Sequence, residues 1–167
     1  KKQVIKNNEF FPFIILPSIL LIFITKFYPE IESISWWGYG DDWTRFQAFA
    51  RAIVVDKEWL RAGEGVFFYR PGIRYVYALI HIIFGQSGFA QKIIEIWLIF
   101  GSSFLLYKIL LNFKITSYSC YIGSLLLLII LFGDNYRWLI GRGLVEYYAL
   151  FGLMLLAYLF TILDIRK

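Results

Sequence analysis

Two adjacent aspartates, Asp41 and Asp42, open the segment "DDWTRFQAFARAIVVDKEWL" and have the residue type needed for acid–base chemistry. A carboxylate beside a tryptophan and an arginine can have its proton affinity tuned by partial desolvation, and it can then accept a proton from an attacking hydroxyl group. The pair also stands where a helical pattern begins, and there an aspartate accepts backbone N–H bonds as an N-cap. General base and helix cap are both open roles, and the two can coexist in the pair.

A second group of candidate residues lies in "GEGVFFYRPGIRY", where Arg70 directly precedes Pro71. Proline fits the first turn of a helix, and a guanidinium beside a helix amino terminus makes an anion site. The alternative is that Arg70 and Arg74 reach toward lipid headgroups. A carboxylate on one wall of a pocket and fixed positive charge on another would suit a lipid-linked phosphate substrate, attacked by a nucleophile that loses a proton.

Metal and nucleotide chemistry are limited by the residue inventory. The chain has one histidine, His81, and one cysteine, Cys120, which excludes a zinc site built from His and Cys ligands. A magnesium or manganese ion on Asp41 and Asp42 remains open. Cys120 lies in an apolar run and is interpreted as a small buried residue. No P-loop, GxGxxG motif or Ser/His/Asp set is visible, so nucleotide-dependent chemistry is not supported.

The elements that must position these residues are membrane helices. In 167 residues, 59% are hydrophobic, 21% are aromatic and the mean hydropathy is +0.63, which predicts an all-α integral membrane protein. At about 1.5 Å per residue, a hydrocarbon core of about 30 Å needs roughly 20 apolar residues. We predict four spans in one membrane domain, at about residues 10–27, 93–111, 115–132 and 144–163. Because the chain starts without methionine and ends just after an apolar run, we expect it to be part of a longer polypeptide.

The net charge of +5 comes from lysines and arginines at the ends of the apolar runs, which is a topology signal and not a sign of a nucleic-acid partner. It places the amino terminus inside and a large loop, about residues 28–92, outside. Residues 73–84 are too few to span comfortably. Arg74, Tyr77 and His81 share one helical face there, which predicts a helix lying in the interface; a fifth span is the alternative.

Helical periodicity also organises the first part of the loop. One stripe is apolar, and a second stripe is polar; the apolar members are Trp43, Phe46, Phe49, Ala50 and Ile53, and the polar members are Thr44, Gln47 and Arg51. Such a pattern is typical of an amphipathic helix. We expect this helix to lie on the membrane surface.

These motifs carry a family resemblance. "DWTRFQAFARAIVVDKEW" resembles the first outer loop of the GT-C superfamily of membrane glycosyltransferases, which often reads like D-x-x-R-Y-x-x-x-A-R with a later tryptophan. "YRPGIRYVYALIHIIFG" is similar to the family's basic residue before a proline and a juxtamembrane helix ending in Phe-Gly. A Q-x-x-F/A stretch before the next span and "GRGLVE" also fit. The likeness covers nearly the whole chain and includes bacterial enzymes of the protein mannosyltransferase (glycosyltransferase family 39) and aminoarabinose transferase kind.

The resemblance implies an inverting transfer of a hexose or pentose from a polyprenyl-phosphate donor to a lipid, glycan or protein acceptor, on the outer face of a bacterial cytoplasmic membrane. It places Asp42, beside Asp41, on the family's catalytic aspartate, and Arg45 on its arginine. The other residues expected at the substrate site are Arg70 at the donor phosphate, with Arg74, Glu64, Tyr69, Arg142 and Glu146. Tyr69 stands where the aminoarabinose type has a glutamate, so the second carboxylate and the metal stay open.

Two other classes of function compete with the enzyme. One is a non-catalytic membrane subunit or scaffold of an envelope glycan assembly system. The other is a transporter of lipid-linked oligosaccharide, which would place ionisable residues inside the spans. Here the acidic residues stand at the span ends, which disfavours the transporter.

Overall fold

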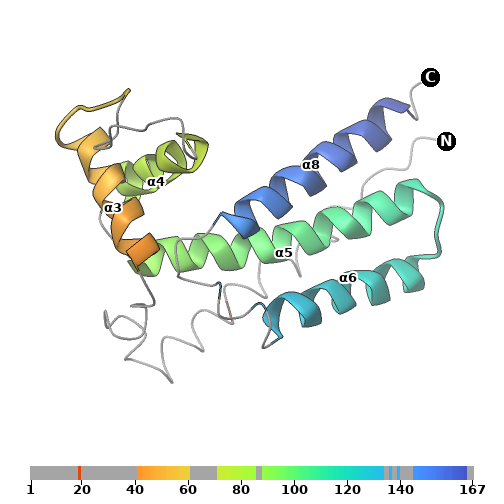
Figure 1. The fold of residues 1–167 in the computed structure, drawn as a ribbon. Helices are drawn as coiled ribbons and strands as arrows, with labels where there is room; N and C mark the ends of the chain where they lie inside the picture. Colours follow the sequence, from red (N-terminus) through yellow and green to blue (C-terminus); the bar gives the residue numbers. More distant parts are fainter. Residues whose placement is uncertain are drawn as a thin grey trace. The chain divides into compact units, whose positions relative to one another are not determined.

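The computed structural model describes residue 19 and residues 41–60, 71–85, 88–133, 136, 139 and 145–164. This part of the chain holds five long helices and no strand (Figure 1): α3 Asp41–Val54, α4 Pro71–Phe84, α5 Gly88–Asn112, α6 Ser117–Phe132 and α8 Glu146–Asp164. For the described residues, the prediction of an all-α fold is confirmed. The helices belong to two compact units, and α5 contributes to both, with the division after Glu95.

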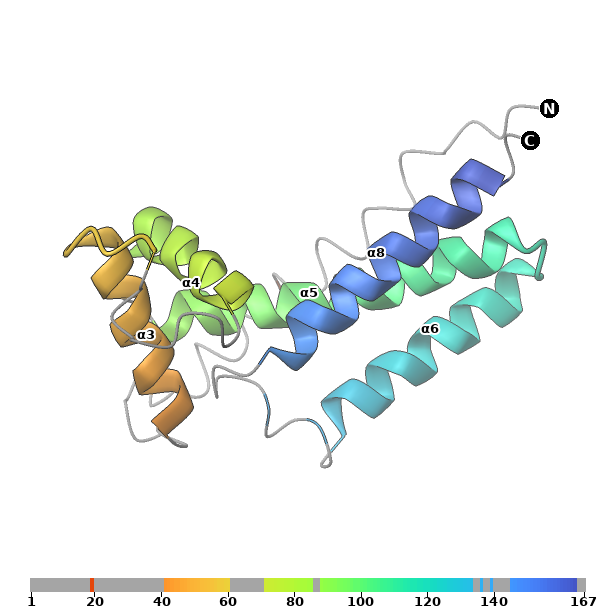
Figure 2. The same cartoon turned by 45° about the horizontal axis from the view of Figure 1, so that its top comes forward.

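The first unit contains α3, α4 and α5 up to Glu95. The apolar stripe of α3 is buried: Phe46 is 4% exposed and Ile53 is fully buried. Helices α3 and α4 lie side by side in both views (Figures 1 and 2), and the ring of Phe46 stacks on that of Tyr77 with centroids 5.6 Å apart. The described members of the stripe therefore face the interior of this unit and not the bilayer, while the expectation that α3 lies at the membrane surface stays a prediction.

The second unit contains α5 from Ile96 onward together with α6 and α8 from Tyr147 onward. Small residues on α5 allow close packing of its neighbours. Ser103 donates a hydrogen bond to the carbonyl oxygen of Ser124 on α6, at 2.8 Å. A Cβ added to Gly101 would lie 2.8 Å from the ring of Phe151 on α8, so a larger residue there would force the ring to move. Small interfacial residues and interhelical hydrogen bonds are typical of helices packed in membranes.

Two of the described helices are long and apolar enough to cross a membrane, over Ala90–Asn112 in α5 and Glu146–Leu163 in α8. They correspond to the predicted spans at 93–111 and 144–163. Helix α6 covers the third predicted span but is shorter, and the predicted span at 10–27 lies outside the described helices. The described part of the chain thus has two helices that are able to span a membrane, and the presence of four spans stays a prediction.

Three helix ends use backbone with positive φ. Gly85, with φ of 72°, follows α4, as the Phe-Gly motif predicts, because glycine adopts this conformation without strain. Lys57, with φ of 62°, follows α3, and Lys114, with φ of 61°, follows α5. Lysine pays a steric penalty in this region that glycine does not. The surrounding hydrogen bonds, including Lys57 Nζ to the carbonyl oxygen of Val54 at 2.7 Å, hold the first of these turns.

Candidate functional site

The predicted acid pair lies in the first turn of α3. The helix begins at Asp41, so Asp41 and Asp42 occupy its first two positions. The structure describes their backbone only. The first backbone N–H groups of a helix lack partners within it, and this end carries partial positive charge. A carboxylate in this turn is therefore in a favourable electrostatic setting whether it caps the helix or takes part in chemistry.

The other predicted substrate residues fall in three groups. Arg70, Glu64, Tyr69 and Arg142 lie outside the described residues. Two of the remaining residues are exposed: Arg45, which is one turn into α3, and Glu146, which is the first residue of α8. Their side chains are open to solvent or to a ligand. The structure does not bring these exposed residues into a described common site.

Arg74 behaves differently from the prediction. Its side chain is only 2% exposed, and its guanidinium carbon lies 4.2 Å from the centroid of the Phe49 ring on α3. A guanidinium over an aromatic face at this distance is a cation–π contact, which strengthens when the pair is desolvated. Arg74 therefore packs between α3 and α4. Arg74 lies on the inner face of α4 and not on its outer face. The alternative in which this residue reaches toward lipid headgroups is therefore wrong.

The outer face of α4 is apolar and exposed, while its inner face buries Ile73, Ala78 and Ile80 together with polar side chains. Arg74 and Tyr77, which were predicted to share a face, point inward and are buried, and His81 is half-buried. The outer face carries exposed apolar side chains, including Leu79 at 56% and Ile83 at 60% exposure. An exposed apolar face of this kind is the arrangement expected of a helix lying against lipid.

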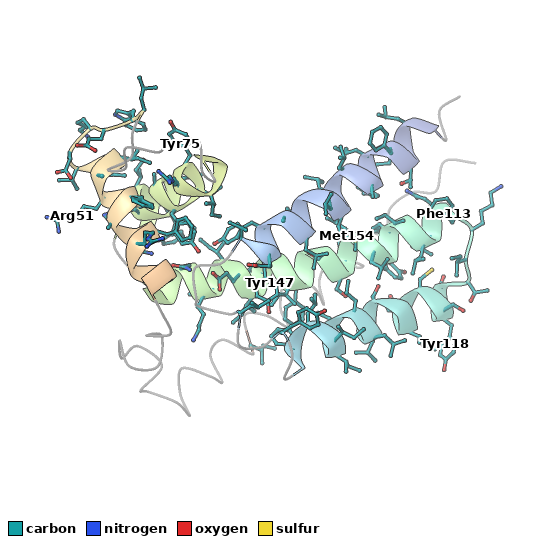
Figure 3. All side chains as sticks on the ribbon, viewed as in Figure 1. Arg51, Tyr75, Phe113, Tyr118, Tyr147 and Met154 are labelled. Carbon is teal, nitrogen blue, oxygen red and sulfur yellow. The ribbon has the colours of Figure 1, made fainter. Side chains whose placement is uncertain are left out.

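An aromatic pair marks the edge of this apolar surface. Tyr75 donates a hydrogen bond from its hydroxyl group to the carbonyl oxygen of Trp59, at 2.6 Å. Both side chains remain exposed, as Figure 3 shows for Tyr75. Tryptophan and tyrosine are enriched at membrane–water interfaces, since one end of each ring is apolar and the other polar. Arg51, also labelled in Figure 3, points away from α4 on the exposed face of α3.

A buried polar cluster, which the sequence analysis missed, joins α3, α4 and the beginning of α5. We call it the Gln91 cluster; its members are Gln47, Tyr77, Gln91 and Glu95. Gln91 is fully buried, accepts a hydrogen bond from Gln47 Nε2 at 3.0 Å, and donates to the Tyr77 hydroxyl at 2.7 Å and to Glu95 Oε1 at 2.9 Å. Three helices thus meet at one amide group.

The cluster corrects the prediction for Gln47. The sequence places Gln47 on the polar stripe with Thr44 and Arg51, but its side chain is 4% exposed while Arg51 is exposed. Gln47 is buried because Gln91 offers a hydrogen-bond acceptor inside the protein, which removes the cost of burying an unpaired amide. Glu95 is also fully buried, and Lys92, 7% exposed, interacts with it electrostatically. One signal in the sequence could have found the cluster: Gln91 and Glu95 stand four residues apart and therefore share a helical face.

Cys120 on α6 is fully buried and its thiol faces the carbonyl oxygen of Ile115, so its interpretation as a small buried residue is confirmed.

In the part of the chain that the structure describes, no three His, Cys, Asp or Glu side chains gather to hold a metal ion. The magnesium or manganese site on Asp41 and Asp42 depends on side chains outside that part, and it stays a prediction.

Comparison with protein-family models, with curated proteins and with solved structures gave no significant match. The resemblance to the GT-C superfamily therefore rests on the order and spacing of the motifs in the sequence.

Proposed function

We propose that this chain belongs to a membrane glycosyltransferase that transfers a sugar from a polyprenyl-phosphate donor to an acceptor on the outer face of the membrane. One observation carries the proposal: the helix that begins with Asp41 and Asp42 is packed on the helix that begins one residue after Arg70. Phe46 against Tyr77 and Phe49 against Arg74 make this contact. The two sequence motifs that resemble the family thus belong to one folded pair of helices.

The apolar outer face of α4 supports the same proposal. A polyprenyl donor is held by the bilayer, so an enzyme that uses it needs its reactive groups near the interface. Exposed Leu79, Ile82 and Ile83 give the unit a surface suited to that depth. Helices α5 and α8, which are long enough to span, supply the membrane attachment.

The proposed reaction is a single displacement at the anomeric carbon. Asp42 accepts the proton of the acceptor hydroxyl as its oxygen bonds to the anomeric carbon. The bond from that carbon to the phosphate oxygen breaks, and polyprenyl phosphate leaves with the bonding electrons while the configuration inverts. Arg70 stabilises the phosphate by charge-assisted hydrogen bonds. Arg45, exposed one turn beyond the acid pair, is available for the substrate.

The remaining predicted residues have more limited parts in this proposal. Glu64, Tyr69, Arg142 and Glu146 are further candidates for contacts with the sugar or the acceptor. Arg74, buried on Phe49, would organise the α3–α4 pair from within.

The test is transfer from radiolabelled polyprenyl-phosphate sugars by membranes that contain the full-length protein. We expect labelled product with at least one donor, and membranes without the protein serve as the control. A chain that binds the donors but transfers from none, across hexose and pentose donors and in the presence of Mg²⁺ or Mn²⁺, would contradict the proposal and favour the non-catalytic scaffold.

A further inference from the structure

We propose that Gln91 is a positioning residue, which fixes α3, and with it the Asp41–Asp42 pair, on the beginning of α5 through its bond with Gln47. The inference rests on the proposed function for its catalytic consequence. We call the hydrogen bond between Gln47 and Gln91 the anchor; whether it holds α3 in place can be tested without any enzymatic activity. None of the sequence motifs that resemble the family contains Gln91.

The chemistry of the amide group makes the anchor directional. A glutamine side chain has one carbonyl oxygen that accepts and one amino group with two donors. Gln91 uses both of its donors, one on Tyr77 and one on Glu95, and its oxygen accepts from Gln47. In the structure, Glu95 Oε1 accepts from the amino group of Gln91. Because that amino group also donates to Tyr77, the oxygen of Gln91 is left facing α3, where Gln47 donates to it.

The contacts between α3 and α4 do not duplicate this anchor. The stacked Phe46 and Tyr77 rings and the Arg74–Phe49 contact hold the two helices together through apolar and cation–π surfaces, which tolerate sliding. Buried hydrogen bonds have strict distance and angle requirements, and they select one arrangement more than they add stability. The bond from Gln47 to Gln91 is therefore suited to set how α3 sits on the beginning of α5.

The distance from this anchor to the acid pair is long enough for a small tilt to matter. Gln47 follows Asp42 by five positions, which is about 7.5 Å along a helix. A tilt of roughly 10° about Gln47 would shift the backbone of Asp42 by about 1.3 Å, given that rise. A misplacement of about 1 Å can cost on the order of 100-fold in rate.

The test uses Gln47→Met in the full-length protein. Methionine has similar length and volume but no donor, so it removes the bond to Gln91 while the packing of α3 is kept. We expect kcat to fall by about 10- to 100-fold while KM for the donor stays within about twofold, because the substrate contacts remain. Ala48→Met, which places the same side chain on the exposed face of the same helix, is the matched control and should keep both constants.

A second readout does not depend on activity. Hydrogen exchange of the α3 backbone should become faster by about 3- to 10-fold in Gln47→Met and stay at the parent's rate in Ala48→Met. The exchange of α4 should change little, since loss of a net hydrogen bond promotes local opening. If α3 exchanges faster in Gln47→Met but the parent protein transfers no sugar, the anchor is supported and the proposed function is rejected. Parental kcat with parental exchange would reject the anchor and leave the function standing. Faster exchange with parental kcat would overturn the positioning role.

If Gln47→Met does not accumulate in membranes, Glu95→Gln provides the same test. Glu95 Oε1 accepts from Gln91 in the structure, whereas the amino group of a glutamine at this position could also donate to the Gln91 oxygen and compete with Gln47 for it. Exchange in α3 should again become faster. An α3 that exchanges at the parental rate in Glu95→Gln would overturn the inference.

Discussion

Truncation of Phe46 tests whether α4, and not lipid, covers the apolar stripe of α3. Phe46 is 4% exposed, stacks on Tyr77 and lies edge-on to Phe49 with ring centroids 6.1 Å apart. Phe→Ala in a packed site costs about 3–5 kcal/mol, of which about 0.5–1.5 kcal/mol reflects an aromatic pair. If the α3–α4 contact opens locally, the substitution raises the equilibrium constant for that opening. At about 1.4 kcal/mol per decade, the increase is about two to three and a half decades.

The assay is thiol labelling at a buried position of α3. Ile53 is fully buried, so Ile53→Cys in a Cys120→Ser background should label slowly with a maleimide. Adding Phe46→Ala should raise the labelling rate by about 100-fold or more, as the opening equilibrium requires. Arg51→Ala, which changes an exposed residue of the same helix, should leave the rate unchanged. A rate increase below about threefold in the Phe46 variant would refute the α3–α4 packing, since a side chain facing lipid would not control access to Ile53.

Three further predictions concern topology, the donor and the membrane surface. Cysteines placed at Glu64 and Lys114, in the Cys120→Ser background, should label from opposite sides of the membrane with Glu64 outside; labelling from one side would refute the four-span topology. Arg70→Ala should weaken donor affinity by roughly one to two decades, with partial recovery in Arg70→Lys, and unchanged binding in both variants would exclude a phosphate contact. A bimane on Leu79→Cys should be quenched by brominated lipids about twofold or more relative to one on Arg51→Cys, as expected for a helix face in lipid, and equal quenching would contradict a lipid-facing α4.

The sequence predicted the helices well where periodicity and glycine signals agree. The apolar stripe of α3 was recognised from its spacing, and α4 ends at Gly85 as its Phe-Gly motif indicates. The ends of α3 and α5 carried no such signal, because Lys57 and Lys114 take the positive φ that glycine usually supplies. Hydrogen bonds around these turns decide the conformation; Ile115 N–H, for example, donates to the carbonyl oxygen of Leu110 at 3.2 Å.

The residues that contact each helix face were harder to predict than the composition of the face itself. Periodicity placed Arg74 and Tyr77 together, but it could not show that their face turns inward, since a polar face is normally assigned to water. The pairing with Phe49 and Gln91 decides this, and both partners are distant in sequence. Gln47 was misplaced for the same reason, as its burial depends on a residue 44 positions away. Tertiary contacts of this kind leave no local pattern in a single sequence.

The central claim is that this chain catalyses sugar transfer with Asp42 as the general base. An acceptor hydroxyl must lose its proton as the new bond forms, and removal of a general base costs about 10²- to 10⁴-fold in rate. Asp42→Asn keeps the side-chain shape and can still cap a helix, since Asn caps about as well as Asp, so folding and insertion should survive. Asp41→Asn should be milder unless the pair holds a metal ion, in which case both variants fail.

The most direct measurement compares Asp42→Asn with Asp56→Asn for transfer from a radiolabelled polyprenyl-phosphate sugar, at equal protein levels in membranes. Asp56 is an exposed aspartate just beyond α3, so the same substitution there controls for charge and expression. Turnover should fall by about 10²-fold or more in Asp42→Asn and stay near the parental value in Asp56→Asn, with donor binding retained in both. Near-parental turnover in Asp42→Asn would contradict the account, because it would leave Asp42 no part in the chemistry.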